Sequence, residues 1–355
     1  MKFRQPLLLA TVALPALTAA AQADVKVIAS IKPVHSLVAA IMQGAGEPAL
    51  IIEGASSPHT YSLKPSQAAA LQDADIVFWI GEQMEAFLEK PINSIASETK
   101  SVALAHAHGL ETLPFREGGA FEKHTHDDHD DDHDHEDEHA EADHDHAEDH
   151  DHDDGHDHGD EHEHEEDHAE DEHAHEHDHD HGEVDMHVWL DPVNAKAMAH
   201  EIAETLAEAD PDNAELYEKN AAALSERVDA LTTELQAELE PLHDTGYIVF
   251  HDAYQYFENR FGLKPAGSIT VTPDVMPGAD RLREIQGKVR ELDATCVFAE
   301  PQFEPKLVSV VTEGTEARSG VLDPLGAELT PGPDLYFDVM RGMADAFTSC
   351  LSGDS

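Results

Sequence analysis

Short apolar runs alternate with helical segments along the first hundred residues. Four of these runs predict strands, at Val25–Ser30, Ala49–Ile52, Ile76–Ile80 and Ser101–Ala105. Between them, segments that begin or end at Pro or Gly predict helices, at Pro33–Met42, Pro65–Leu71 and Gln83–Lys90. We expect Pro91 to end the last of these helices. Strands that alternate with helices predict parallel β-α-β units, so this part of the chain should be an α/β lobe.

The same rhythm returns near the C-terminus and predicts a second α/β lobe. Its strands are expected at Tyr247–Phe250, Ser268–Val271, Cys296–Ala299 and Gly320–Leu322. Its helices are expected at Asp252–Arg260, Ala279–Arg290, Lys306–Thr312 and Leu335–Phe347.

A long helical pattern separates the two predicted lobes. Pro192 should begin a helix that runs to about Glu208, and residues 212–239 contain neither Gly nor Pro. Apolar side chains recur there at helical spacing, at Leu216, Leu224, Val228, Leu231, Leu235 and Leu239. A helix of about 28 residues spans ~40 Å. We therefore expect an N-terminal lobe at 24–210, a rigid backbone helix at 211–242, and a C-terminal lobe at 243–355.

Residues 122–183 break this pattern, because nearly all of them are His, Asp or Glu. The tract contains 20 of the 28 histidines and 32 of the 75 acidic residues, with Lys123 as its single base. It therefore carries −31 of the formal charge of −54. With so few apolar side chains it cannot offset the entropy cost of ordering, so we expect a disordered loop.

Histidine-rich tracts are typical of metal capture, and carboxylates add attraction for divalent cations. The alternative is an acidic solubilising spacer, which would not need histidines. Ordering a flexible tract costs entropy and weakens binding, so the defined metal site should lie elsewhere. We assign accessory capture to the tract, with candidates His124, His126, His129, His133, His135, His175, His177, His179 and His181.

The N-terminus resembles a secretory signal peptide. Lys2 and Arg4 precede the apolar run Pro6–Leu17, and an Ala-Gln-Ala site ends at Ala23. A membrane anchor is the alternative, but the run is short and contains Pro15. We expect residues 1–23 to be cleaved and the chain to be exported. Its acidity argues against nucleic-acid and anionic-membrane partners. No later apolar run reaches the ~18 residues of a transmembrane helix, so we expect no membrane insertion.

Cys296 and Cys350 are the only cysteines. In an exported chain, a pair is most simply one disulfide, worth ~4 kcal/mol in the chain-entropy model. Two unrelated thiols remain an alternative. A metal site is less favoured, because no second ligand lies at the usual spacing.

Three of the eight histidines outside the tract occupy similar positions. His59 follows an apolar strand, His187 lies in an extended segment before a helix, and His251 directly follows a strand. Open α/β sheets bind ligands at the carboxyl ends of their strands, so these side chains could meet in a cleft between the lobes. Three neutral imidazoles form a good zinc shell. Taken singly, each is more often a hydrogen-bonded histidine.

Two carboxylates are further candidates. Asp323 follows a strand and precedes Pro324, so it could be a fourth ligand or simply a turn or N-cap residue. Glu300 could be a ligand or could hydrogen-bond a ligand histidine. Three histidines with an open position also describe hydrolytic zinc. H-E-x-x-H matches such as those at residues 135–139 and 164–168 are chance products of the tract, and no nucleophile motif is present, so we do not expect an enzyme.

Five local strings, in this order, resemble the zinc-binding subunit of bacterial ABC importers, the ZnuA type. The resemblance covers essentially the whole mature chain. The strings are SPHTYSLKPS at 57–66, DMHVWLDP at 185–192, FHDAYQYFE at 250–258, CVFAEPQF at 296–303 and LDPLG at 322–326.

The resemblance implies two α/β lobes on a rigid helix, with the metal in the cleft between them. It makes His59, His187 and His251 ligands, and Asp323 matches a fourth-ligand position. Manganese members tend to place a carboxylate where His251 stands, so a third imidazole favours zinc. Some zinc members have an acid just before the first histidine, but here that residue is Pro58, so water or Asp323 would complete the shell.

The resemblance further implies a Cys296–Cys350 bridge and a mobile His-rich loop near the cleft. The expected function is a monomeric periplasmic receptor that binds Zn²⁺ and delivers it to an inner-membrane ABC permease with its ATPase subunit. The alternatives are a periplasmic zinc buffer or store, a manganese-type binding protein, and a zinc hydrolase.

Overall fold

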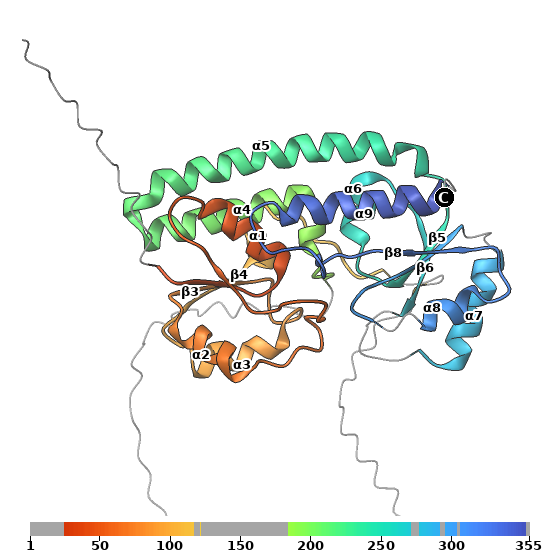
Figure 1. Ribbon diagram of the computed structural model, residues 1–355, viewed down its shortest axis with the longest axis horizontal. Helices are drawn as coiled ribbons and strands as arrows, with labels where there is room; N and C mark the ends of the chain where they lie inside the picture. The colour runs from red at the N-terminus through yellow and green to blue at the C-terminus, as the bar shows by residue number, and fades with distance from the viewer. Residues whose placement is uncertain are drawn as a thin grey trace, which may run out of the picture. The chain divides into compact units, whose positions relative to one another are not determined.

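The computed structural model describes residues 25–116, 121, 184–270, 277–291, 295–303 and 306–352. The predicted signal peptide and the tract at 122–183 lie outside these residues. All described residues belong to one compact unit, which contains two four-stranded parallel sheets (Figure 1). The two predicted α/β lobes are therefore confirmed.

The first sheet has the strand order β2-β1-β3-β4. Its strands are β1 (Val27–Ala29), β2 (Ala49–Leu50), β3 (Ile76–Trp79) and β4 (Lys100–Ala103). Every residue of β1 and β3 is buried, which explains their continuous apolar runs. The helices α2 (Pro65–Asp73) and α3 (Ala86–Ser94) lie on one side of this sheet, and α1 (Lys32–Ile41) lies on the other (Figure 1).

The second sheet repeats the topology, with the order β6-β5-β7-β8. Its strands are β5 (Tyr247–His251), β6 (Pro265–Thr270), β7 (Cys296–Ala299) and β8 (Arg318–Val321). Side chains alternate along β5: Ile248 and Phe250 join a cluster under α7 (Ala279–Glu291) and α8 (Lys306–Thr312), while Tyr247 and Val249 join the larger core. The helix α6 (Gln255–Phe261) follows β5.

Helices join the two sheets through a common core. The long helix α5 (Ala214–Leu239) packs against α1, α4 (Pro192–Ala209) and α9 (Leu335–Leu351). Short 3-10 turns precede and follow α5, at Pro211–Asn213 and Glu240–Leu242, and others lie at Leu104–His106 and Val188–Leu190. The buried face of α5 carries the leucines and valine that predicted the helix, Leu224, Val228, Leu231, Leu235 and Leu239.

The predicted end of the third helix at Pro91 is wrong. Helix α3 begins at Ala86, and Pro91 lies inside it. Proline removes only its own N–H bond, and its carbonyl still accepts from the backbone N–H of Ile95 at 2.9 Å. Leu88 and Ile92, four residues apart, are both buried and hold the helix on the sheet on either side of the proline.

The disulfide Cys296–Cys350 is present and joins β7 to α9, with the Cα atoms 6.1 Å apart. Among the described residues, no helix is both long enough and apolar enough to cross a bilayer.

Candidate metal centre

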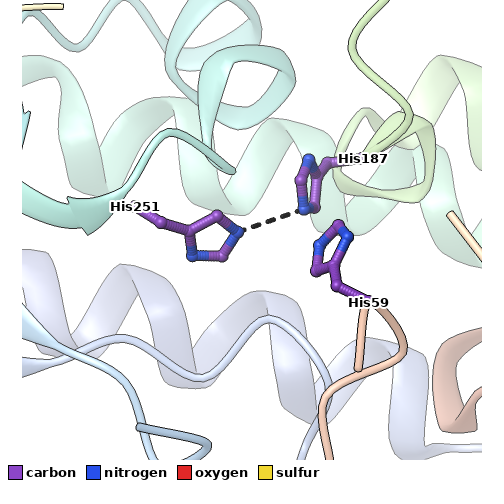
Figure 2. A group of neighbouring side chains, drawn as sticks. All are labelled: His59, His187 and His251. Atoms are coloured by element: carbon purple, nitrogen blue, oxygen red, sulfur yellow. Dashed lines mark hydrogen bonds between the residues drawn. The ribbon is translucent and has the colours of Figure 1, made fainter. Parts of the chain in front are cut away.

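Three imidazoles from distant parts of the chain meet at one point. His59 comes from the loop between β2 and α2, His187 from the segment before α4, and His251 from the end of β5 (Figure 2). Their ligand nitrogens all lie within 4.8 Å of one another. His187 and His251 are buried, and His59 is half-buried. The structure thus brings together all three histidines of the predicted trio.

The spacing of the nitrogens suits a small metal ion. The Nε2 atoms of His187 and His251 are 3.3 Å apart. Two nitrogens at Zn–N distances of about 2.0–2.1 Å in a tetrahedral shell are separated by about 3.3–3.4 Å. This pair therefore already stands at the separation that a tetrahedral zinc ion requires.

Carboxylates orient two of the three rings. The Oδ1 atom of Asp185 lies 2.7 Å from Nδ1 of His187, and Oε1 of Glu300 lies 2.5 Å from Nδ1 of His251. An ionised carboxylate only accepts hydrogen bonds, so each Nδ1 carries a proton and Nε2 is the nitrogen left for a metal ion. Glu300 directly follows β7, and β5 and β7 are the strands between which the order of the second sheet reverses, where α/β sheets bind ligands.

The protonation of the trio is uneven. Burial lowers the pKa of His59 well below 6.5, and the neighbouring imidazoles lower it further. Burial, with His251 nearby, also lowers the pKa of His187 well below 6.5. For His251, burial acts in the same direction, but the Glu300 carboxylate outweighs it and raises the pKa. Two of the three rings are therefore neutral and ready to bind a cation at neutral pH.

Gln67 on α2 fastens the loop that carries His59. Its Nε2 donates to the carbonyl of Ile51 at 2.6 Å, before the loop, and its Oε1 accepts the backbone N–H of Lys64 at 2.9 Å, after it. The same side chain lies 2.8 Å from the hydroxyl of Tyr61 within the loop. One glutamine thus connects both ends and the middle of the loop.

Apolar side chains close the cavity around the trio. Trp189, Phe303 and Leu325 line it, and it leaves about 10 Å³ of free space for water-sized molecules. That space accommodates about one water molecule and excludes an organic ligand. The arrangement suits an ion with few additional ligands.

Asp323 stands outside the group of three. Its Oδ2 accepts a hydrogen bond from the backbone N–H of Ala327 at 2.6 Å. Its Oδ1 accepts one from the backbone N–H of Leu325 and one from the side-chain Nε2 of Gln302, both at 3.2 Å. In this structure the carboxylate therefore organises the turn after β8. A role for Asp323 as a direct ligand stays a prediction.

The sequence matches the model of one protein family over most of its length. The family model "Zinc-uptake complex component A periplasmic" (ZnuA) matches residues 27–350. The chain belongs to the ZnuA family. The match includes both lobes, the helices between them and all three clustered histidines.

Curated relatives agree with this membership over nearly their full length. A protein of Brucella suis biovar 1 (strain 1330), named "High-affinity zinc uptake system protein ZnuA", is 56% identical over 326 residues, which cover 92% of this chain and 91% of the relative. Proteins of the same name from Paracoccus denitrificans (strain Pd 1222) and Yersinia pestis are 41% and 36% identical, over 98% and 93% of this chain and 96% and 92% of the relatives.

Solved structures share the fold of this ZnuA-family chain. A crystal structure of ZnuA matches with a TM-score of 0.64 at 25% identity and covers 91% of this chain and 100% of that chain. The laminin-binding adhesin Lmb of Streptococcus agalactiae, in a mutant structure, matches with a TM-score of 0.66 at 21% identity, over 92% and 99% of the two chains. The second likeness concerns the fold alone.

Sequence reasoning missed several residues that shape this ZnuA-family site. Asp185 lies two residues before His187 in an extended segment, so its side chain and the imidazole share a face, and this spacing could have revealed it. Gln67 stands at the third position of α2 and accepts from the N-cap backbone, so the capping-box pattern could have revealed that contact. The contact of Gln302 with Asp323 spans 21 residues, and no local pattern marks it. Glu300, which we expected to be a ligand or the partner of a histidine, has the hydrogen-bonding position.

Proposed function

We propose that this protein is the periplasmic zinc receptor of an ABC importer, which captures Zn²⁺ and delivers it to a membrane permease coupled to an ATPase. The observation that carries the proposal is the convergence of three imidazoles within 4.8 Å, with two Nε2 atoms at tetrahedral spacing. Membership of a zinc-uptake family supports zinc as the cargo and the periplasm as the location. Export would use the predicted signal peptide at 1–23.

His59, His187 and His251 are the proposed direct ligands, with Glu300 and Asp185 as their hydrogen-bonding partners. Neutral imidazoles suit zinc better than manganese, which favours oxygen ligands. The cargo would be held between the first and second halves of the chain, because His59 and His251 come from different sheets. The receptor binds its ion and does not transform it, so no catalytic residue is proposed.

Replacing one ligand tests the assignment. We expect His59→Ala to weaken the tightest zinc site by about 100-fold or more, since even outer-shell substitutions cost 10–100-fold. The matched control is His200→Ala, because His200 is exposed on α4. Competition with a chelator of known affinity measures both variants. Equal zinc affinity for His59→Ala and the unchanged protein would refute the ligand assignment.

The tract at 122–183 is the proposed accessory capture segment. The described residues on either side of it lie beside the site: the backbone N–H of Asp185 donates to the carbonyl of Leu113 at 2.9 Å, and Pro114 and Val184 form an antiparallel bridge. Zinc bound by the tract would therefore be tethered to the site at high effective concentration. Deleting 122–183 should remove extra, weaker zinc equivalents in calorimetry and leave the tightest site in place.

A periplasmic zinc buffer or store is the alternative function. A receptor needs a permease to supply the cell with zinc, whereas a buffer or store acts without one. We expect the gene to restore growth of a receptor-deficient strain under zinc chelation only when the importer's permease is present. Rescue without the permease would favour the buffer.

A further inference from the structure

Gln302 occupies an unusual position on the cavity wall. It lies two residues after Glu300, and its side chain lines the cavity that contains the three histidines. Its Nε2 donates to Oδ1 of Asp323 at 3.2 Å. Because a carboxylate only accepts hydrogen bonds, the NH₂ end of the amide must face Asp323. The oxygen end must therefore point away from Asp323.

That oxygen is an acceptor without a donor. Oε1 of Gln302 is buried and has no hydrogen-bond partner among the described residues. Leaving a buried acceptor unpaired is costly, because the group has given up its hydrogen bonds to water and gained none in return. Such a cost at the wall of a binding cavity is explained if the ligand of that cavity supplies the missing donor.

The charges around the trio favour a neutral fourth ligand. Asp185 and Glu300 are buried, and each accepts a hydrogen bond from one of the ligand histidines. Their two negative charges together balance the charge of one divalent cation. A third carboxylate in the shell would leave the buried site with an uncompensated negative charge, which is costly. Zinc takes four ligands, three imidazoles are present, and the remaining space fits about one water molecule.

We propose that Gln302 is a positioning residue for the metal cargo, whose Oε1 accepts a hydrogen bond from the water molecule that completes the shell of three imidazoles. Asp323 acts through Gln302 by fixing the orientation of the amide. This inference rests on the proposed zinc-binding function. It makes Gln302 a determinant of the fourth position, which takes a neutral ligand that can donate a hydrogen bond.

The test uses the full chain loaded with one equivalent of Zn²⁺, or of Co²⁺, whose visible spectrum reports its ligands. Gln302→Met removes the acceptor at nearly constant volume, and Gln302→Asn keeps the amide but withdraws it from the cavity. The matched control is Gln236→Leu, because Gln236 is exposed on α5. Thermal melting of each variant shows that it is folded.

We expect both Gln302 variants to weaken zinc by about 10-fold, as loss of an outer-shell partner does. We also expect them to change the Co²⁺ spectrum and its dependence on pH, while Gln236→Leu changes neither. Gln302→Met with unaltered zinc affinity and Co²⁺ spectrum would overturn the inference. So would a loss of more than 100-fold in Asp323→Asn together with an unaffected Gln302→Met, because Asp323 would then be a direct ligand.

His59→Ala separates this inference from the proposed function. If His59→Ala binds zinc as tightly as the unchanged protein, the proposed function fails. If His59→Ala loses the site but Gln302→Met does not differ from the unchanged protein, only the role of Gln302 fails.

Discussion

At the scale of single residues, a proton and the metal compete for the same nitrogen atoms. With both Nδ1 protons donated to carboxylates, the 3.3 Å contact between the Nε2 atoms of His187 and His251 needs one further proton. The raised pKa of His251 and the lowered pKa of His187 place that proton on His251. Zinc can bind only after this proton leaves.

Zinc affinity should therefore depend on pH through His251. The affinity should rise with pH until the raised pKa of His251 is passed and then level off, because the ring above that pH is already neutral. His59 and His187, with lowered pKa values, add competition only at more acidic pH. Calorimetry in two buffers of different ionisation enthalpy should show about one proton released near pH 6.5.

The experiment is cleanest on the variant lacking 122–183, because the tract contributes 20 further histidines that would exchange protons for zinc. Glu300→Gln serves as the comparison. It removes the main cause that raises the pKa of His251, so the pH dependence should move to lower pH. Proton release that is the same in both proteins would contradict this account.

The glutamine that fastens the His59 loop should matter nearly as much as a ligand's own partner. Gln67→Ala removes the contacts to Ile51, Lys64 and Tyr61 together, so His59 loses its fixed position. We expect zinc to bind about 10-fold more weakly. Gln72→Ala, an exposed change five residues later on α2, should leave the affinity unaltered in the same chelator competition.

The predictable part of the site is the part set by local sequence. His59 lies in the loop after β2 and His251 ends β5, and the carboxyl ends of parallel strands are where ligands bind, so their positions made them candidates. The contact of Glu300 with His251 spans 49 residues and depends on β5 pairing with β7. Such contacts, like that of Gln302 with Asp323, depend on the order of the strands in the sheet, and no local sequence pattern predicts that order.

At the scale of elements, one turn of the second half is bound to the first half. Nζ of Lys32, at the start of α1, donates to the carbonyls of Gly326, Ala327 and Leu329 at 2.8, 2.7 and 3.1 Å. The indole of Trp189 donates to the carbonyl of Pro324 at 2.9 Å. The turn that contributes Leu325 to the wall of the cavity is therefore positioned from across the molecule.

Lys32→Met should loosen this turn. The substitution keeps most of the apolar stem but leaves three carbonyls without their donor, so we expect the free energy of unfolding to fall by about 2 kcal/mol. Zinc should also bind more weakly, because the wall of the cavity is no longer fixed. Urea unfolding and chelator competition measure the two effects. Lys219→Met, an exposed change on α5, should have neither.

The elements themselves were largely predictable because burial imposes a period. The leucine spacing of α5 is the spacing of its buried face, and the apolar run of β3 is a strand buried on both sides. The prediction that Pro91 ends the third helix was wrong because it considered only the hydrogen bond that proline removes. The buried contacts of Leu88 and Ile92 outweigh that loss. The return of α9 onto α1 was not predictable, because it depends on packing between the ends of the chain.

At the scale of the whole molecule, the proposed ligands connect halves that also share a core. His59 belongs to the first sheet's loops and His251 to the second sheet, while α5 packs on helices of both halves. The trio exists only when these parts are folded together. Zinc at this site should therefore bind the folded chain and not the unfolded one, and it should stabilise the fold.

At free zinc about 100-fold above the dissociation constant, this linkage contributes about 2.7 kcal/mol. For a chain of this size that corresponds to a rise in melting temperature of about 4–5 °C, which chelation should reverse. Differential scanning calorimetry in buffered zinc measures it. His59→Ala should lose most of the shift. The variant lacking 122–183 should keep the rise in melting temperature. A tract that binds zinc equally well in the folded and the unfolded chain does not change the free energy of unfolding. A shift that survives in His59→Ala but disappears with the tract would show that the stabilising zinc is bound by the tract.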